Sequence, residues 1–257
     1  MTERQKLWIR SDRERVGYRR SMRPVFLSAL NRQAAPLFEL ISEATSIDNI
    51  SLPVSVDHKP VEEAYKTLYL TIAPAFALSK RNKYKKSYTK GEEEVFNDLI
   101  HDRVLAYLRI HAGETVTATG DTTLEIIRQK LKVLMPQVAE SGMSAGTAVT
   151  NLRAMLMSEW HQAARFRVER IVRTEVNRAS NLGSLEGMQS LNMPMKKVWL
   201  SAFTEKSRPE HMDADGQEVG LYDDFEVGGE FLQYPGDPKG SAGMTINCLC
   251  SLYERLL

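Results

Sequence analysis

A chain of 257 residues with 42% hydrophobic and 26% charged residues is typical of a globular protein with one large domain or two ordinary ones. It has no apolar stretch near the roughly 18 residues of a membrane span, and its amino terminus lacks the apolar run of a signal peptide. We therefore expect synthesis in a cytoplasm and no membrane partner. The net charge of +1 hides an asymmetry, because residues 1–178 hold 28 Lys and Arg against 21 Asp and Glu, whereas residues 179–257 hold 6 against 12.

The first part of the chain predicts helices. Apolar spacing indicates a helix over the first 45 residues, interrupted at Pro24 and Pro36, and then a linker over 46–60. Further helices are expected over 61–78, 92–110 and 123–139, with the turn-rich segment 111–123 closing the second of them. A long helix is expected over 148–191, with an end that Gly183 and Gly187 would weaken.

The character of the sequence changes after Pro194. Residues 196–203 alternate in polarity, and "DADGQEV", "VGGEFLQYPGDP" and "TINCLCSLY" are short strand candidates separated by Gly, Pro and Asp turns. The predicted fold class is therefore α+β. A mostly helical region over 1–145 precedes a smaller α+β domain over 146–257, which has short antiparallel strands.

Both cysteines lie in the last of these strand candidates. Alternate residues of a strand share a face, so Cys248 and Cys250 would point the same way, in line with Ile246 and Leu252. A disulfide between them is disfavoured, because an extended chain holds their side chains nearly parallel. A zinc site would need His211 and one more ligand, with Asp213 or Asp215 near by in sequence. We favour buried structural thiols and no cofactor, with zinc as the alternative.

An acidic residue stands on the apolar face of the long helix. Glu175 shares that face with Val172, Val176 and Ala179, and a buried carboxylate is costly unless it is paired. Arg208 and His211 are the partners that we expect. We expect structural polar ties from four residues: Glu175, Arg208, His211 and Asp215. The alternative is that this part of the helix is solvated.

The segment "KRNKYKKSYTK" combines six basic residues with two tyrosines and no acid. This composition is typical of a loop that contacts phosphate, with rings available to lie against sugar or base. The candidates for DNA contact are Lys80, Arg81, Lys83, Lys85, Lys86 and Lys90. A second candidate is the arginine-rich amino terminus, from Arg4 to Arg23. Such contact would be independent of DNA sequence, and the alternative is that both segments are simply solvated.

Several short motifs follow one another in a specific order. They are "RTE" near the end of the long helix, then "KKVW", "SRPEH", "DGQEV", "F.VGG", "YPGDP" and a terminal "INCLC". Together they resemble the phage Mu F-like family of minor head proteins, over roughly residues 145–255. The Arg208, His211, Asp215, Gly216, Cys248 and Cys250 positions of the family pattern are kept. The segment Thr204–Ser207 and Leu249 depart from it.

The resemblance implies a structural protein inside a phage head, made in the host cytoplasm and associated with the portal vertex. Its implied partners are the portal protein, major capsid or scaffold proteins and, in some relatives, double-stranded DNA. It implies no settled catalytic activity, so we expect no enzyme. The alternative is a phage-delivered toxin, or a hydrolase that uses His211 with Cys248 or Cys250, although an acidic carboxy-terminal region does not favour a reactive thiolate.

Overall fold

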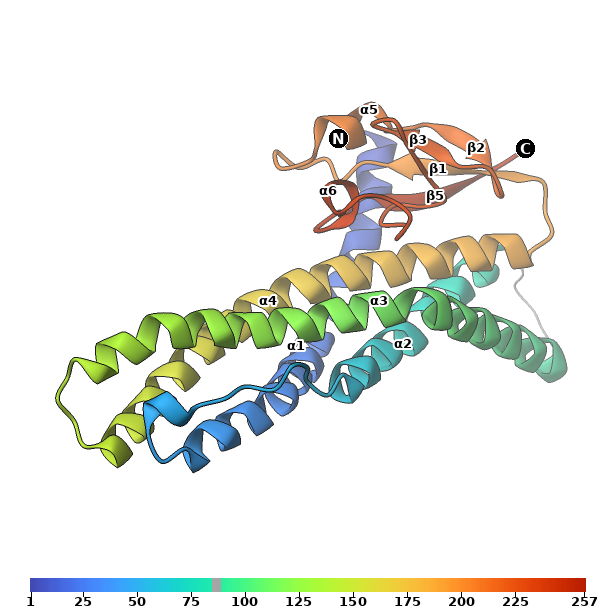
Figure 1. Ribbon diagram of the computed structural model, residues 1–257. Coiled ribbons are helices and arrows are strands. Elements are labelled where there is room, and N and C mark those ends of the chain that lie inside the picture. The colour runs from blue at the N-terminus through green and yellow to red at the C-terminus, as the bar shows by residue number, and fades with distance from the viewer. Residues whose placement is uncertain (85–88) are drawn as a thin grey trace. The chain divides into compact units, whose positions relative to one another are not determined.

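The computed structural model describes residues 1–84 and 89–257 (Figure 1). Contacts divide the chain into two compact units. The strand-bearing unit contains Met1–Met22, Lys66–His111 and Arg170–Leu257, and the helical unit contains Arg23–Tyr65 and Ala112–Glu169. Each unit thus takes segments from both sides of residue 145, and the division into 1–145 and 146–257 stays a prediction of the sequence.

Among the described residues, four long helices account for most of the chain: α1 (Glu3–Glu43), α2 (Lys59–Tyr84), α3 (Lys90–Ala139) and α4 (Ala145–Ser190). A short 3₁₀ turn, η1 (Ile47–Asn49), follows α1. The prediction that Pro24 and Pro36 interrupt the first helix is wrong. Both prolines lie on exposed positions of α1, where water can satisfy the carbonyl groups that proline leaves unpaired. None of the described helices is long and apolar enough to cross a membrane.

The predicted turn over 111–123 is also wrong, because this segment is the middle of α3. Its residues are weak helix formers, but the threonine hydroxyl groups bond back to carbonyl oxygens one turn earlier, as Thr119 does to Thr115 and Thr122 to Ala118. Val116 is buried in the helical unit, and Thr123 is fully buried there. Tertiary packing therefore overrides the turn-like local sequence.

The core of the helical unit is formed by one apolar stripe from each helical segment. Phe26 and Tyr65 meet edge to face with ring centroids 5.1 Å apart. Arg167 is buried and donates to Thr123 Oγ1 at 2.9 Å and to the Thr119 carbonyl at 2.8 Å. The buried apolar residues include Leu30, Leu37, Ile41, Leu124, Ile127, Leu131, Leu152, Leu156 and Trp160.

The strand-bearing unit contains two small antiparallel sheets. One has the order β2-β1-β5, with β1 (Met195–Leu200), β2 (Glu218–Gly220) and β5 (Ser251–Leu256), and the other pairs β3 (Phe225–Val227) with β4 (Glu230–Leu232). Two short helices, α5 (Pro209–Asp213) and α6 (Ala242–Thr245), lie beside the strands, near the start of α1 (Figure 1). The predicted α+β class with short antiparallel strands is confirmed.

Within the same unit, α2 and α4 approach each other at small residues. A methyl group added to Gly183 would lie 2.7 Å from the Cα atom of Ala73, and one added to Gly187 would lie 2.6 Å from the Ala77 carbonyl oxygen. The glycines that seemed to weaken the end of α4 therefore permit this contact, and α4 continues through both of them to Ser190.

Candidate functional site

The two cysteines lie in an irregular segment between α6 and β5. The prediction of a strand through "TINCLC" is wrong, because α6 ends at Thr245 and β5 begins only at Ser251. Between them Asn247 adopts a left-handed backbone with φ of 58°, a conformation that asparagine tolerates better than most residues. The chain reverses at this turn, and both Cys248 and Cys250 are buried behind it.

His211 meets both cysteines. It lies on α5, which begins with Pro209 as its first helical residue. His211 Nδ1 is 3.3 Å from Cys250 Sγ and 3.6 Å from Cys248 Sγ, and each of the three residues is 2% exposed. The Trp199 ring packs edge-on against the imidazole, with centroids 5.6 Å apart. The three side chains thus form one buried cluster, named here the His-Cys cluster, from two segments 37 residues apart.

The two thiols of the His-Cys cluster differ in acidity. Hydrogen bonding from Cys250, assisted by His211, holds the pKa of Cys248 well below its usual value, although burial opposes the shift. The interaction with Cys248 and burial both raise the pKa of Cys250 well above its usual value. Cys248 is therefore the more acidic of the two thiols.

Arg15, one of the amino-terminal arginines that are candidates for DNA contact, is buried and instead holds this cysteine segment in place, so that expectation is wrong for this residue. Arg15 is 1% exposed and donates to Ser251 Oγ at 2.8 Å, Ser180 Oγ at 2.7 Å and Asn181 Oδ1 at 2.9 Å. Burial lowers the pKa of Arg15 to about 10. Its only signal in the sequence is its position seven residues after Trp8 on the same face of α1.

Two further groups bind the same segment. Trp8 Nε1 donates to the Leu249 carbonyl at 2.8 Å, and Asn181 Nδ2 donates to the Cys250 carbonyl at 3.0 Å. Asn181 Oδ1 also accepts the backbone N–H of Leu252 at 3.0 Å. The cysteine segment is therefore fixed from α1 and from α4 by hydrogen bonds to its backbone.

Glu175 is buried and paired, but not with the partners that the sequence suggested. Arg178 Nη1 donates to its Oε1 at 2.9 Å and Tyr69 OH donates to its Oε2 at 2.7 Å. Arg208 instead donates to the Ile246 carbonyl at 2.6 Å, and His211 contacts the cysteines. The predicted pairing of Glu175 with Arg208 and His211 is wrong, because Arg178, three residues along the same helix, pairs with the carboxylate.

The Asp215 carboxylate contacts two neighbouring segments. Its Oδ1 accepts the backbone N–H of Ser201 at 2.9 Å, and its Oδ2 lies 3.2 Å from Arg4 Nη1. The carboxylate thereby joins the end of β1, the turn before β2 and the start of α1. The motif residues Arg208, His211 and Asp215 thus all bind neighbouring segments of the strand-bearing unit.

The basic segment is partly neutralised by an acid from β5. Glu254 is 2% exposed and pairs with Lys80 and, at 2.8 Å, with Lys83. Arg81 is also buried, donates to the Glu92 carbonyl at 2.9 Å and lies over the Phe96 ring. Lys90 is exposed and 3.9 Å from Glu94. The candidates Lys85 and Lys86 lie outside the described residues. Of the other four candidates, Lys80 and Lys83 pair with Glu254, and Arg81 is buried.

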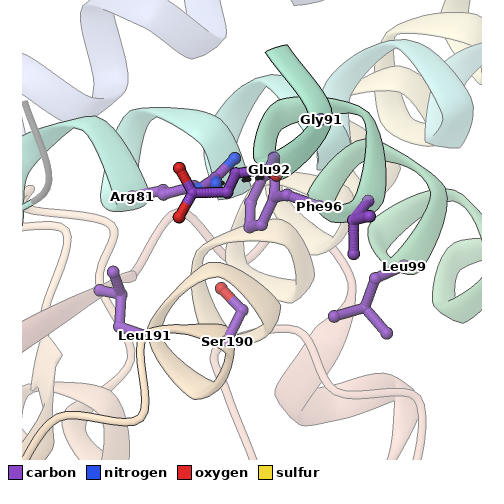
Figure 2. Close-up of a pocket in the computed structure, with 8 residues that line it drawn as sticks. Arg81, Gly91, Glu92, Phe96, Leu99, Ser190 and Leu191 are labelled. Atoms are coloured by element: carbon purple, nitrogen blue, oxygen red, sulfur yellow. Dashed lines mark hydrogen bonds between the residues drawn. The ribbon is translucent and has the colours of Figure 1, made fainter. Parts of the chain in front are cut away.

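A groove of about 450 Å³ opens beside this segment, between the start of α3 and the end of α4 (Figure 2). Its apolar rim includes Val95, which is 70% exposed, and Leu99, which is 40% exposed. The other lining residues are Arg81, Gly91, Glu92, Phe96, Ser190 and Leu191. The groove is therefore separate from the His-Cys cluster, none of whose residues lines it.

Comparison with known proteins gives one family and two curated relatives. Residues 133–253 match the family model described as "Phage Mu protein F like protein". The chain is similar to the uncharacterized protein YqbB of Bacillus subtilis, with 26% identity over 132 residues, which cover 50% of this chain and 43% of YqbB. It is also similar to the NAD(+)--arginine ADP-ribosyltransferase EFV of Enterococcus faecalis, with 29% identity over 104 residues, which cover 39% of this chain and 21% of that protein. The chain thus spans less than half of either relative, and no solved structure matches it significantly.

Proposed function

Since residues 133–253 carry a Phage Mu protein F like region, we propose that this protein is a minor head protein that acts in head assembly inside the capsid. Its location is at the portal vertex, in contact with the portal protein and with capsid or scaffold proteins. The family match is the observation that carries this proposal.

The geometry of the motif residues agrees with a structural role. Arg208 and Asp215 bind backbone groups of neighbouring segments, and the segment around the cysteines is fixed from α1 and α4. The motifs thus stabilise one compact arrangement of short elements. A stable arrangement with exposed outer faces suits a protein whose function consists of contacts with other proteins.

The proposal is tested by the composition of phage particles. We expect procapsids and mature virions, purified from a lysate of a phage that encodes a tagged version of this chain, to contain the tagged chain in a constant ratio to the portal protein. Mass spectrometry of gradient-purified particles measures that ratio, and an abundant host enzyme is the control for trapped cytoplasm. Finding the chain only in the soluble fraction would contradict the proposal.

We also propose that DNA contact, as part of this function, involves the amino-terminal helix. Arg10, Arg13 and Arg20 are exposed, and their spacing of three and seven residues places them on one face of α1. Such a row of arginines attracts phosphate regardless of DNA sequence. Because Lys80 and Lys83 both pair with Glu254, which offsets part of their charge, this row is a better candidate than the basic segment.

Replacing Arg10, Arg13 and Arg20 by Gln is expected to weaken binding of unrelated duplexes to a similar degree. The slope of log affinity against log salt should fall by up to about 3, because each lost phosphate contact removes close to one counterion. Fluorescence anisotropy at several salt concentrations measures both quantities. The matched control replaces Arg109, Lys196 and Lys206 by Gln, which removes the same charge elsewhere in the unit. Equal effects of the two triple variants would show that only net charge matters.

The enzymatic alternative has a direct test. This alternative covers two kinds of enzyme. The relative EFV is named as an arginine ADP-ribosyltransferase. A cysteine hydrolase, in contrast, would need a thiolate within reach of substrate. Cys248 and Cys250 are each 2% exposed, which disfavours such a nucleophile. Incubating the purified chain with labelled NAD⁺ and host lysate is expected to give no labelled protein above a heat-treated control, and labelling above it would favour the alternative.

A further inference from the structure

We infer that the His-Cys cluster binds a zinc ion through His211 Nδ1, Cys248 Sγ and Cys250 Sγ. The three ligand atoms lie within 4.8 Å of one another. Nδ1 is 3.3 Å and 3.6 Å from the two sulfurs. In a tetrahedral zinc site with ordinary bond lengths, a nitrogen and a sulfur ligand lie about 3.6 Å apart. The cluster therefore places three of the four ligands of a zinc site at suitable distances before any metal enters.

The imidazole can accept a hydrogen bond from only one of the two thiols. A neutral imidazole with its proton on Nε2 has one lone pair on Nδ1, so it accepts from one thiol at a time. Nε2 of His211 is itself buried and has no hydrogen-bond partner in the described part of the chain. A cation held by Nδ1 and the two sulfurs would be bound by all three atoms at once.

The ligands are held before any metal binds. Asn247, whose φ is 58°, turns the cysteine segment, and its backbone N–H bonds to Thr174 Oγ1 at 3.0 Å. Arg208 fixes the Ile246 carbonyl, and Trp8 fixes the Leu249 carbonyl. Because the segment is anchored on both sides of Cys248, little conformational entropy is lost when the metal binds.

The chemistry of the donor set selects the metal. Two thiolates and an imidazole favour zinc over the hard cations magnesium and calcium. A fourth His, Cys, Asp or Glu does not join the cluster within residues 1–84 and 89–257, so the remaining position falls to a non-protein ligand such as water. The site would hold its metal whether or not the protein assembles into heads.

The test measures metal content and the metal's ligands separately. Full-length protein purified with Zn²⁺ and passed through gel filtration is expected to retain about one zinc per chain by elemental analysis. His211→Ala, Cys248→Ser and Cys250→Ser should each reduce that to a small fraction. His101→Ala is the matched control, because His101 is an exposed histidine of the same unit, and it should leave the zinc content unchanged.

Cobalt substitution gives a second readout that uses the unaltered protein, so it does not require that the substituted variants fold. Replacing zinc by Co²⁺ in the unaltered protein is expected to produce the intense sulfur-to-cobalt absorption of a thiolate site, and added Zn²⁺ should remove it. Unaltered protein that retains no zinc and shows no such band would overturn the inference and leave the cluster as packed thiols. Zinc retained by the Cys248→Ser, Cys250→Ser double variant would overturn it as well, because the metal would then lie elsewhere.

Discussion

Replacing either Glu175 or Arg178 by Ala is expected to lower the free energy of unfolding by about 3–5 kcal/mol, because each change leaves the other charge buried and unpaired. The two residues are 4% and 7% exposed. Burial lowers the pKa of Arg178, but the Glu175 carboxylate more than offsets this and raises it above its ordinary value. An arginine stays protonated in proteins even without a partner, so Arg178 cannot escape the cost of losing Glu175 by giving up its proton.

The double variant separates a pair from two independent effects. Glu175→Ala with Arg178→Ala should cost clearly less than the sum of the single changes, because no unpaired charge remains. Replacing the pair by Leu and Met, which fill similar volumes, should return the stability close to that of the unaltered protein. Urea unfolding followed by circular dichroism measures all four values.

An exposed ion pair between α4 and α1 is the matched control. Glu169 lies 2.7 Å from Arg23, and both side chains are about half exposed (56% and 47%). Glu169→Ala should change the stability by less than about 1 kcal/mol. Costs for Glu175→Ala and Arg178→Ala that simply add, or that match the cost of Glu169→Ala, would contradict the assignment of a buried pair.

The sequence predicts the existence of most elements because their signals are local. The apolar periods of α1, α2 and α4 and the Gly, Pro and Asp turns between the short strands lie within single segments. The bounds of α3 could not be predicted in the same way. Its middle has the composition of a turn, and only burial of Thr123 and its neighbours in the helical unit makes it helical.

The candidate site was predictable in its residues but not in its contacts. The ordered motifs identified His211, Cys248 and Cys250, which the structure brings together. The strand assigned to the cysteines failed because a run of five or six alternating residues does not reveal the left-handed turn at Asn247. The buried contact of Arg15 with Ser251 could not be predicted, since it joins residues 236 positions apart, and no local pattern carries such a pairing.

Gly183→Ala is expected to destabilise the protein by about 1–3 kcal/mol or more, although the same change in an open helix position stabilises. The added methyl group would lie 2.7 Å from the Cα and carbonyl carbon atoms of Ala73 and closer still to the carbonyl oxygen. Because these are backbone atoms of α2, no side chain can rotate away. The two helices would have to separate, and the contacts of Ala77 with Gly187 would be lost with those of Ala73.

Gly17 supplies the control for this prediction. It lies inside α1 in the same unit, and a methyl group there would meet no atom within 4 Å. Gly17→Ala should therefore stabilise the protein by about 0.5–1 kcal/mol, because alanine loses less backbone entropy in a helix. Thermal unfolding of the two variants should move the midpoint in opposite directions from that of the unaltered protein. A stabilising Gly183→Ala would show that α2 and α4 do not approach each other as closely as this structure places them, and the Ala73 and Gly183 contact would have to be abandoned.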